Sequence, residues 1–167
     1  QAGGIIYAED TLWVNGDIRS RVTVATGRFP DTPSTNSDLI INGNISYGGV
    51  QDGTRVLGAI AQGNVLIPYS AAPDALQMDG AYIAQHGRFG RRYYASGAYK
   101  KRTSITRYGM IGSNLTPVTA LSDGNGVVLS GYEQSTATYD SNLLYNPPPF
   151  FPTSGGEYEF LSWSQTE

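Results

Sequence analysis

A short pattern recurs along this chain, and its spacing constrains the fold more than any other feature. It consists of a polar residue, a glycine, any residue and then an apolar residue. Its copies contain Gly16, Gly43, Gly63, Gly87 and, in a looser form, Gly109, so the intervals are 27, 20, 24 and 22 residues. Repeats of about 20–50 residues are typical of solenoids, in which each repeat packs only against its neighbours.

Each copy follows a short run of mostly apolar or β-branched residues, which makes the unit a strand, a glycine corner, a second strand and a loop. The runs are 12–14, 39–41, 59–61, 82–84 and 104–106, and the expected loops are 28–37, 46–54, 69–74 and 91–102. Glycine suits a corner because it accepts backbone angles that other residues avoid. Since side chains alternate along a strand, the apolar residue two positions after each glycine should point inward. We therefore expect one interior ladder of Ile18, Ile45, Val65, Phe89 and Ile111.

The pattern predicts an all-β, single-domain right-handed parallel β-helix whose coils cover residues 1–138. The composition agrees with strands and turns, because 21 residues are Gly, 12 are Tyr and only 15% are charged, against about 25% in an ordinary soluble domain. An antiparallel sandwich or jelly roll is the alternative, since turn signals every 8–12 residues would suit it as well.

The C-terminal residues 139–167 differ from the repeats and form a Pro-rich tail. Pro147, Pro148 and Pro149 enforce a polyproline II conformation, and residues 160–163 are expected to form a short final strand. We predict that this tail packs on the β-helix or on a neighbouring subunit. In either case Leu143, Leu144, Phe150, Phe151 and Trp163 should be mostly buried.

Charge is distributed unevenly around the net value of −3. Residues 88–107 contain seven basic and no acidic side chains, whereas residues 108–167 contain six acidic and no basic ones. Opposite charges of this kind could attract within one molecule or between neighbours. The residues predicted to take part in assembly are Arg88, Arg91, Arg92, Lys100, Lys101, Arg102, Leu144, Tyr145, Phe150, Phe151 and Trp163.

The sequence offers little for catalysis or for binding a cofactor or metal. It has no Cys and a single histidine, His86, which stands at a glycine corner where other copies carry Asn or Gln. The carboxylates are scattered, so we expect no enzyme; a polysaccharide-active β-helix enzyme is a remote alternative. Nucleic acid is not an expected partner, because the net charge is negative and no nucleic-acid motif is present. No apolar run approaches the roughly 18 residues of a membrane span.

Three segments together resemble the C-terminal region of type IV pilin-like, PilX-type exported bacterial proteins. They are residues 39–47, residues 56–65, and the Pro-rich stretch 139–149 with residues 160–163. The resemblance implies extracellular or cell-surface display and carries no functional residues. Such proteins typically begin with an apolar helix that inserts in the membrane or a pilus core, and this sequence lacks that helix. Because the sequence starts at Gln1 without Met, we expect a fragment or a processed form.

These observations favour a non-enzymatic structural subunit of a pilus-like or other surface filament. Its expected partners are further copies of the chain or other pilin-like subunits. The alternative is an adhesin that binds a surface glycan through exposed aromatic residues and the Arg- and Lys-rich loop.

Overall fold

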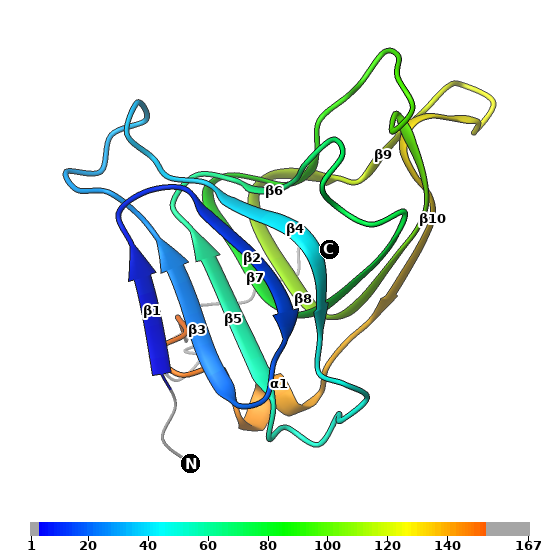
Figure 1. Cartoon of the computed structure of the whole chain (residues 1–167). Coiled ribbons are helices and arrows are strands. Elements are labelled where there is room, and N and C mark those ends of the chain that lie inside the picture. The colour runs from blue at the N-terminus through cyan, green and yellow to red at the C-terminus, as the bar shows by residue number, and fades with distance from the viewer. Residues whose placement is uncertain (1–3, 153–167) are drawn as a thin grey trace, which may run out of the picture.

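The computed structural model describes residues 4–152, which form ten strands and one short helix (Figure 1). The elements are β1 (Gly4–Ala8), β2 (Leu12–Asp17), β3 (Arg21–Thr26), β4 (Leu39–Ser46), β5 (Val56–Ala61), β6 (Val65–Ile67), β7 (Ala75–Arg91), β8 (Lys101–Val118), β9 (Ala120–Ser122), β10 (Val128–Thr138) and α1 (Asn142–Tyr145). Every predicted apolar run lies within a strand. The four predicted loops match the segments between strands to within a few residues, so both expectations are confirmed.

The strands pair in parallel throughout residues 4–152, except where β9 meets β10. Along the sheet the order is β1-β3-β5-β7-β6-β4-β2, so from β1 to β5 strands that follow each other in sequence lie on different parts of it. Off this path, β8 pairs with β7 and β10, and β9 pairs with β10. The sheet folds over at β7, which pairs with β5 through its middle and with β6 through its end, and nearly closes into a barrel (Figure 1). The antiparallel sandwich is therefore wrong.

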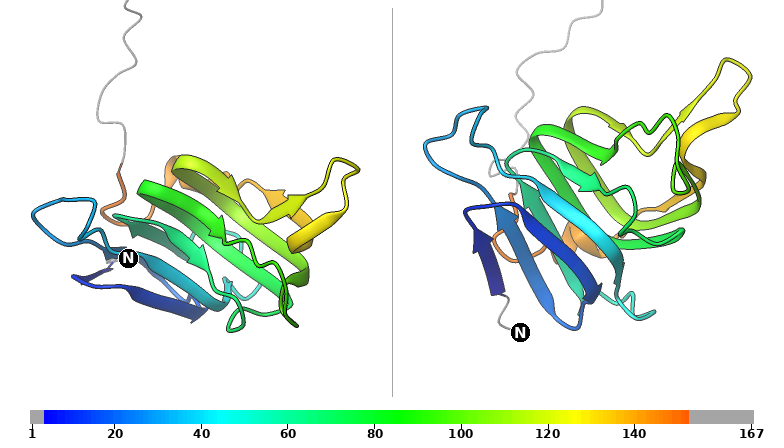
Figure 2. Two further views of the ribbon diagram at one scale, coloured as in Figure 1. Left: turned by 90° about the horizontal axis from the view of Figure 1, so that it is seen from above. Right: turned by 45° about the horizontal axis from the view of Figure 1, so that its top comes forward.

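Paired residues form three separate ladders instead of the single ladder expected from the glycine pattern. The first contains Ile6, Val24, Ala59, Tyr82 and Ile111. The second contains Leu12, Leu39, Val65 and Phe89, and the third contains Ile45, Met78, Arg107 and Ala137. The paired strands form a stack, and in Figure 2 the chain passes in sequence order from β1 at one end of this stack to β8 and β10 at the other.

The expectation that the five residues after the corner glycines share one ladder is wrong, because the glycine pattern occurs at three different corners. Val65 and Phe89 do stack, but Ile45 and Ile111 belong to the other two ladders. The cause is the variable loop length. Because the loops between the copies of the glycine pattern differ in length, successive copies fall at different corners of the fold. Ile45, Val65 and Phe89 are nevertheless fully buried, and Ile18 and Ile111 pack against the same core.

β7 contributes to all three ladders and β8 to the first and the third, and glycines allow both long strands to bend. Gly80 pairs with Gly109, and both have a positive φ, of 147° and 134°. A side chain at Gly109 would collide with the Gly80 carbonyl, so the bend requires glycine there.

The described part of the tail, up to Pro152, runs along the outside of the sheet. Leu143 is buried against Val56 and Ala81, and Phe151 packs beside them. Leu144 and Phe150 are 68% and 73% exposed, so the sheet does not bury them. Their burial against a neighbouring subunit stays a prediction, and Trp163 lies outside the described residues.

Candidate functional site

The basic segment divides into buried and exposed side chains. Arg91 and Arg102 are only 5% and 6% exposed, and both guanidinium groups donate to the carbonyl oxygen of Tyr69. They tie the loop of residues 92–100 and the start of β8 to the loop of residues 68–74. Burial lowers the pKa of Arg91. These two predicted assembly residues are therefore committed to contacts within the molecule.

Two tyrosines of the basic segment, together with Tyr69 of the loop of residues 68–74, pack around these arginines. The Tyr69 ring lies 4.6 Å from that of Tyr94 and 5.6 Å from that of Tyr99, between centroids. Arg91 lies 4.7 Å above the Tyr94 ring, and Arg102 lies 4.6 Å above the Tyr99 ring. The alternation of basic and aromatic residues in the sequence thus builds a cation–π cluster that fixes the two loops.

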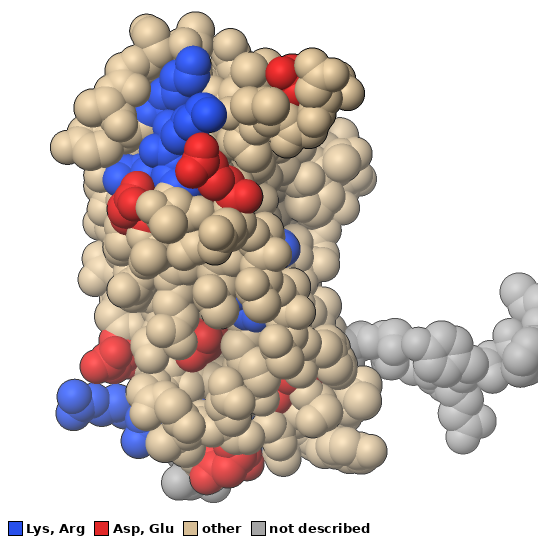
Figure 3. Space-filling model, turned by 90° about the vertical axis from the view of Figure 1, so that its right-hand side faces the viewer, with Lys and Arg blue, Asp and Glu red and all other residues tan. Residues whose placement is uncertain are grey.

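The basic segment also meets acidic side chains within the same molecule. Lys101 Nζ lies 3.5 Å from a carboxylate oxygen of Glu133, which belongs to the acidic C-terminal part of the chain. Arg102 lies 3.8 Å from Asp74. On the face drawn in Figure 3, Lys and Arg side chains form a patch near the top with acidic side chains beside it, and a separate basic group lies at the lower left. The remaining predicted assembly residue of this loop, Lys100, donates from Nζ to the Ala95 carbonyl.

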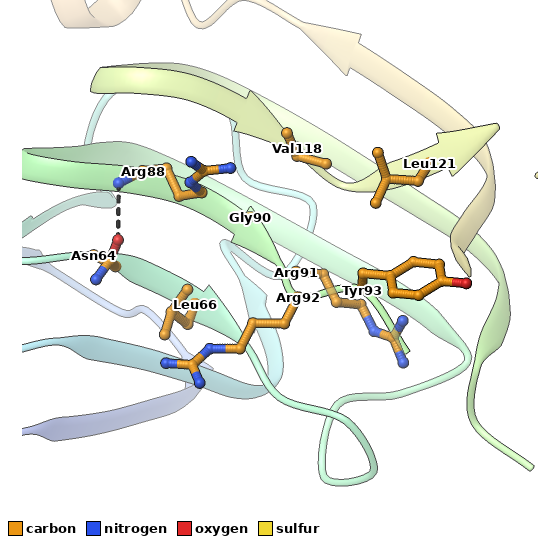
Figure 4. Close-up of a pocket in the computed structure, with 9 residues that line it drawn as sticks. All are labelled: Asn64, Leu66, Arg88, Gly90, Arg91, Arg92, Tyr93, Val118 and Leu121. Atoms are coloured by element: carbon orange, nitrogen blue, oxygen red, sulfur yellow. Dashed lines mark hydrogen bonds between the residues drawn. The ribbon is translucent and has the colours of Figure 1, made fainter. Parts of the chain in front are cut away.

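Arg88 and Arg92 differ from the other arginines of the segment because both are exposed. Within residues 4–152, neither guanidinium group makes a hydrogen bond or an ion pair; the Arg88 bond to Asn64 in Figure 4 comes from the backbone N–H. Arg88 lies in β7 and Arg92 directly follows this strand, and both line the same hollow, with Gly90 midway between them in the sequence.

An apolar stripe crosses five strands on the outer surface of the sheet, and we call it the outer stripe. Each of its residues pairs with the next one, across β2, β4, β6, β7 and β8. These residues are Trp13, Ile40, Leu66, Gly90 and Val118. Trp13 is 56% exposed, and Ile40, Leu66 and Val118 are partly exposed. With strands about 4.8 Å apart, the outer stripe is about 19 Å long and runs along the stack.

Two adjoining hollows lie along the outer stripe and share Leu66 and Arg92. One, of about 350 Å³, is also lined by Asn64, Arg88, Gly90, Arg91, Tyr93, Val118 and Leu121 (Figure 4). The other, of about 310 Å³, is also lined by Thr11, Trp13, Asp38, Ile40, Ile67, Pro68, Tyr69 and Tyr94. In Figure 4, Leu66 lies between the side chains of Arg88 and Arg92, so an apolar floor separates two cationic groups.

Sequence reasoning identified Arg88 and Arg92 but missed the apolar residues of the outer stripe. The signal was present in the runs 12–14 and 39–41, which are apolar at three consecutive positions. When the outer two residues of such a run point into the core, the middle one must point away from it. Trp13 and Ile40 are those middle residues.

A second candidate surface is the pair of open ends of the stack. Within residues 4–152, β1 pairs only with β3 and β2 only with β4, so each leaves one edge unpaired. The part of β8 from Met110 to Val118 pairs on one side only, with β7. Ile5, Ile6 and Tyr7 of β1 are about half exposed.

His86 lies at an exposed corner, where its Nε2 is 2.8 Å from a carboxylate oxygen of Asp31. Its backbone N–H donates to the Gln62 carbonyl, in keeping with a corner role. Over residues 4–152, no three His, Cys, Asp or Glu side chains gather closely enough to hold a metal ion. In the same range, the structure contains no helix with the length and apolarity to span a membrane.

Comparison with protein-family models, with curated proteins and with solved structures finds no match. The chain is thus defined by its fold, a mostly β structure with a parallel sheet that nearly closes into a barrel, and by the outer stripe and open ends described above.

Proposed function

We propose that this chain is a non-enzymatic structural subunit of a filament displayed on the cell surface, built by head-to-tail stacking of copies. The observation that supports this most directly is the presence of unpaired parallel strand edges at both ends of the stack. A strand edge presents unpaired backbone N–H and C=O groups, which makes it a template for pairing with another chain.

The proposed architecture behind this function is a right-handed parallel β-helix. The coils of a β-helix require ladders of parallel pairs, and the three ladders fit this requirement. From β1 to β4, each strand pairs with the strand two further along the chain, as successive coils would. Connections between parallel strands of one sheet are right-handed in about 98% of cases, which favours the right-handed form.

In head-to-tail stacking, the free edge of β8 of one copy would meet β1 and β2 of the next. The first ladder would continue from Ile111 to Ile6, and the second would continue into Leu12. Since all of these strands run in the same direction, the added pairs would also be parallel. Such a contact joins two different surfaces, so it does not close on itself and generates an open filament.

The resemblance to type IV pilin-like, PilX-type exported proteins supports the same role and an extracellular or cell-surface location. Leu144, Tyr145 and Phe150 of the tail are exposed apolar residues and are proposed to contact neighbouring subunits. Electrostatic selection of the register would fall to Arg88, Arg92 and Lys100, since Arg91 and Arg102 are buried and Lys101 pairs with Glu133 of the same subunit.

The test is the variant Ile6→Lys. Ile6 faces the open end of the core and is 55% exposed, so a lysine costs the isolated subunit little but places a charge in the proposed contact. We expect sedimentation velocity to show concentration-dependent self-association of the parent chain and at least tenfold weaker association of the variant.

The matched control is Val127→Lys, because Val127 is equally exposed, at 54%, and lies in the loop between β9 and β10. This control should associate like the parent. A parent chain that stays monomeric at high concentration, or equal loss in both variants, would contradict the proposal.

A further inference from the structure

We propose that the outer stripe is a binding site for an acidic polysaccharide chain that lies across the strands. In this arrangement sugar rings rest on Trp13 and Leu66, and carboxylate or sulfate groups of the chain pair with Arg88 and Arg92. The inference concerns the side of the stack, so it does not depend on the assembly of its ends.

The charge of the site supports an anionic ligand. Arg88, in β7, and Arg92, which directly follows β7, line the same hollow. Guanidinium groups bind carboxylate and sulfate-like oxygens in a bidentate manner, and no acidic side chain within residues 4–152 occupies either of them. The one carboxylate that lines the hollows, Asp38, accepts hydrogen bonds at Oδ1 from the backbone and side-chain nitrogens of Asn64.

The shape of the site supports a long ligand. Gly90 and Leu66 line the hollow together with the two arginines, and a Cβ at Gly90 would collide with the Val118 carbonyl, so this close approach of β7 and β8 requires glycine. Trp13 lies at one end of the outer stripe, and Tyr93 and Leu121 extend the groove at the other. A chain of about 19 Å could therefore contact an aromatic ring, an apolar floor and two cations in succession.

A polysaccharide fits this surface better than a peptide or a nucleic acid. An extended peptide gains affinity from backbone hydrogen bonds, but on a sheet face the backbone groups are already used between strands. A pyranose chain needs no such groups, because its apolar ring faces can pack on Trp13 and Leu66. Nucleic-acid binding relies on many phosphate contacts, and the outer stripe offers two exposed arginines on a chain of net charge −3.

Isothermal titration calorimetry would test the site with two anionic polysaccharides, polygalacturonate and dextran sulfate. Methyl-esterified polygalacturonate and dextran are their uncharged counterparts, and polyglutamate is an anionic chain without sugar rings. We expect at least one of the anionic polysaccharides to bind, and to bind at least tenfold more tightly than its uncharged counterpart and than polyglutamate. Which of the two binds identifies the anionic group.

The variants Arg88→Gln and Arg92→Gln should each weaken this binding about tenfold, and Trp13→Ala should weaken it severalfold. Arg19→Gln is the matched control, because Arg19 is exposed and lies away from the outer stripe, and it should bind like the parent. The same titrations are repeated in the Ile6→Lys variant, which is expected to self-associate weakly, so that polysaccharide binding is measured separately from self-association.

Three outcomes would overturn the proposal. The first is that neither anionic polysaccharide binds, and the second is that polyglutamate binds as tightly as the sugars do. The third is that Arg19→Gln weakens binding as much as Arg88→Gln, since binding would then reflect charge alone. Thermal unfolding of each variant should match the parent, because all four side chains are exposed.

Discussion

Tyr47 contacts three strands of the core, β5, β7 and β8. Its backbone N–H donates to Asp79 of β7, and its hydroxyl accepts from the backbone N–H of Leu57 in β5. Its ring forms a T-shaped pair with that of Tyr108 of β8, with centroids 6.2 Å apart. Tyr82, which is also buried, donates its hydroxyl to the Asp79 carbonyl. At the scale of residues, buried tyrosines therefore fix the positions of neighbouring strands.

These tyrosines should make the fold sensitive to alkaline pH. Burial raises the pKa of Tyr132 and of Tyr108 to about 12, and raises that of Tyr82 well above its ordinary value of 10.0. Because these tyrosines have a higher pKa in the folded than in the unfolded protein, their contribution to the free energy of unfolding is fully present below about pH 10. It is lost as the pH rises from about 10 through 12. Urea unfolding at a series of pH values should show the free energy of unfolding falling over this window.

A Tyr132→Phe variant checks the assignment. It should lose less stability than the parent between pH 10 and 12, because one titrating group is gone, while Tyr139→Phe, at an exposed position, should follow the parent. A parent chain whose free energy of unfolding stays flat up to pH 12 would refute the prediction.

At the scale of elements, the tail is attached to the sheet by polar and apolar contacts. The Thr23 hydroxyl donates to the Pro149 carbonyl, and the Arg21 guanidinium donates to the Pro147 carbonyl at 2.6 Å. Gly58 of β5 lies directly beneath the tail, where a Cβ would stand 2.6 Å from Phe151. The absence of a side chain at Gly58 therefore lets the tail approach the sheet.

Gly58→Ala should loosen the tail without disturbing the sheet. The added methyl group overlaps Phe151, so we expect a loss of about 1–3 kcal/mol in the free energy of unfolding and faster proteolysis of residues 139–152. Gly112→Ala is the matched control, because there the nearest atom, on Ile83, lies at an ordinary 3.7 Å. Equal stability and equal proteolysis of the two variants would show that the tail does not depend on this contact.

At the scale of the whole molecule, sequence order becomes order along the stack, as Figure 2 shows. The basic segment and the acidic C-terminal part could therefore have lain at separate heights. Instead, β8 and β10 pair side by side, and this brings Lys101 to Glu133. At least part of the opposite charge is thus satisfied within one subunit.

Charge exchange distinguishes pairing within a subunit from pairing between subunits. Lys101→Glu alone should cost at most about 1 kcal/mol, because the pair is exposed, and the double variant Lys101→Glu with Glu133→Lys should regain most of this loss. Self-association measured by sedimentation at low and high salt should be the same in the parent and in Lys101→Glu. A clear difference would mean that Lys101 acts between subunits.

The sequence by itself determined the strands, the loops and the parallel stacking. These depend on local alternation and on the spacing of the glycine pattern, both of which can be read along the chain. It did not determine the corner of the fold that each copy of the glycine pattern occupies. The loops between copies differ in length, so copies with similar sequences fall at different corners. The sequence also did not separate Arg91 from Arg92. Only the tertiary structure buries the first beneath the loop of residues 68–74, leaves the second exposed, and aligns Trp13, Ile40, Leu66, Gly90 and Val118 from strands far apart in sequence.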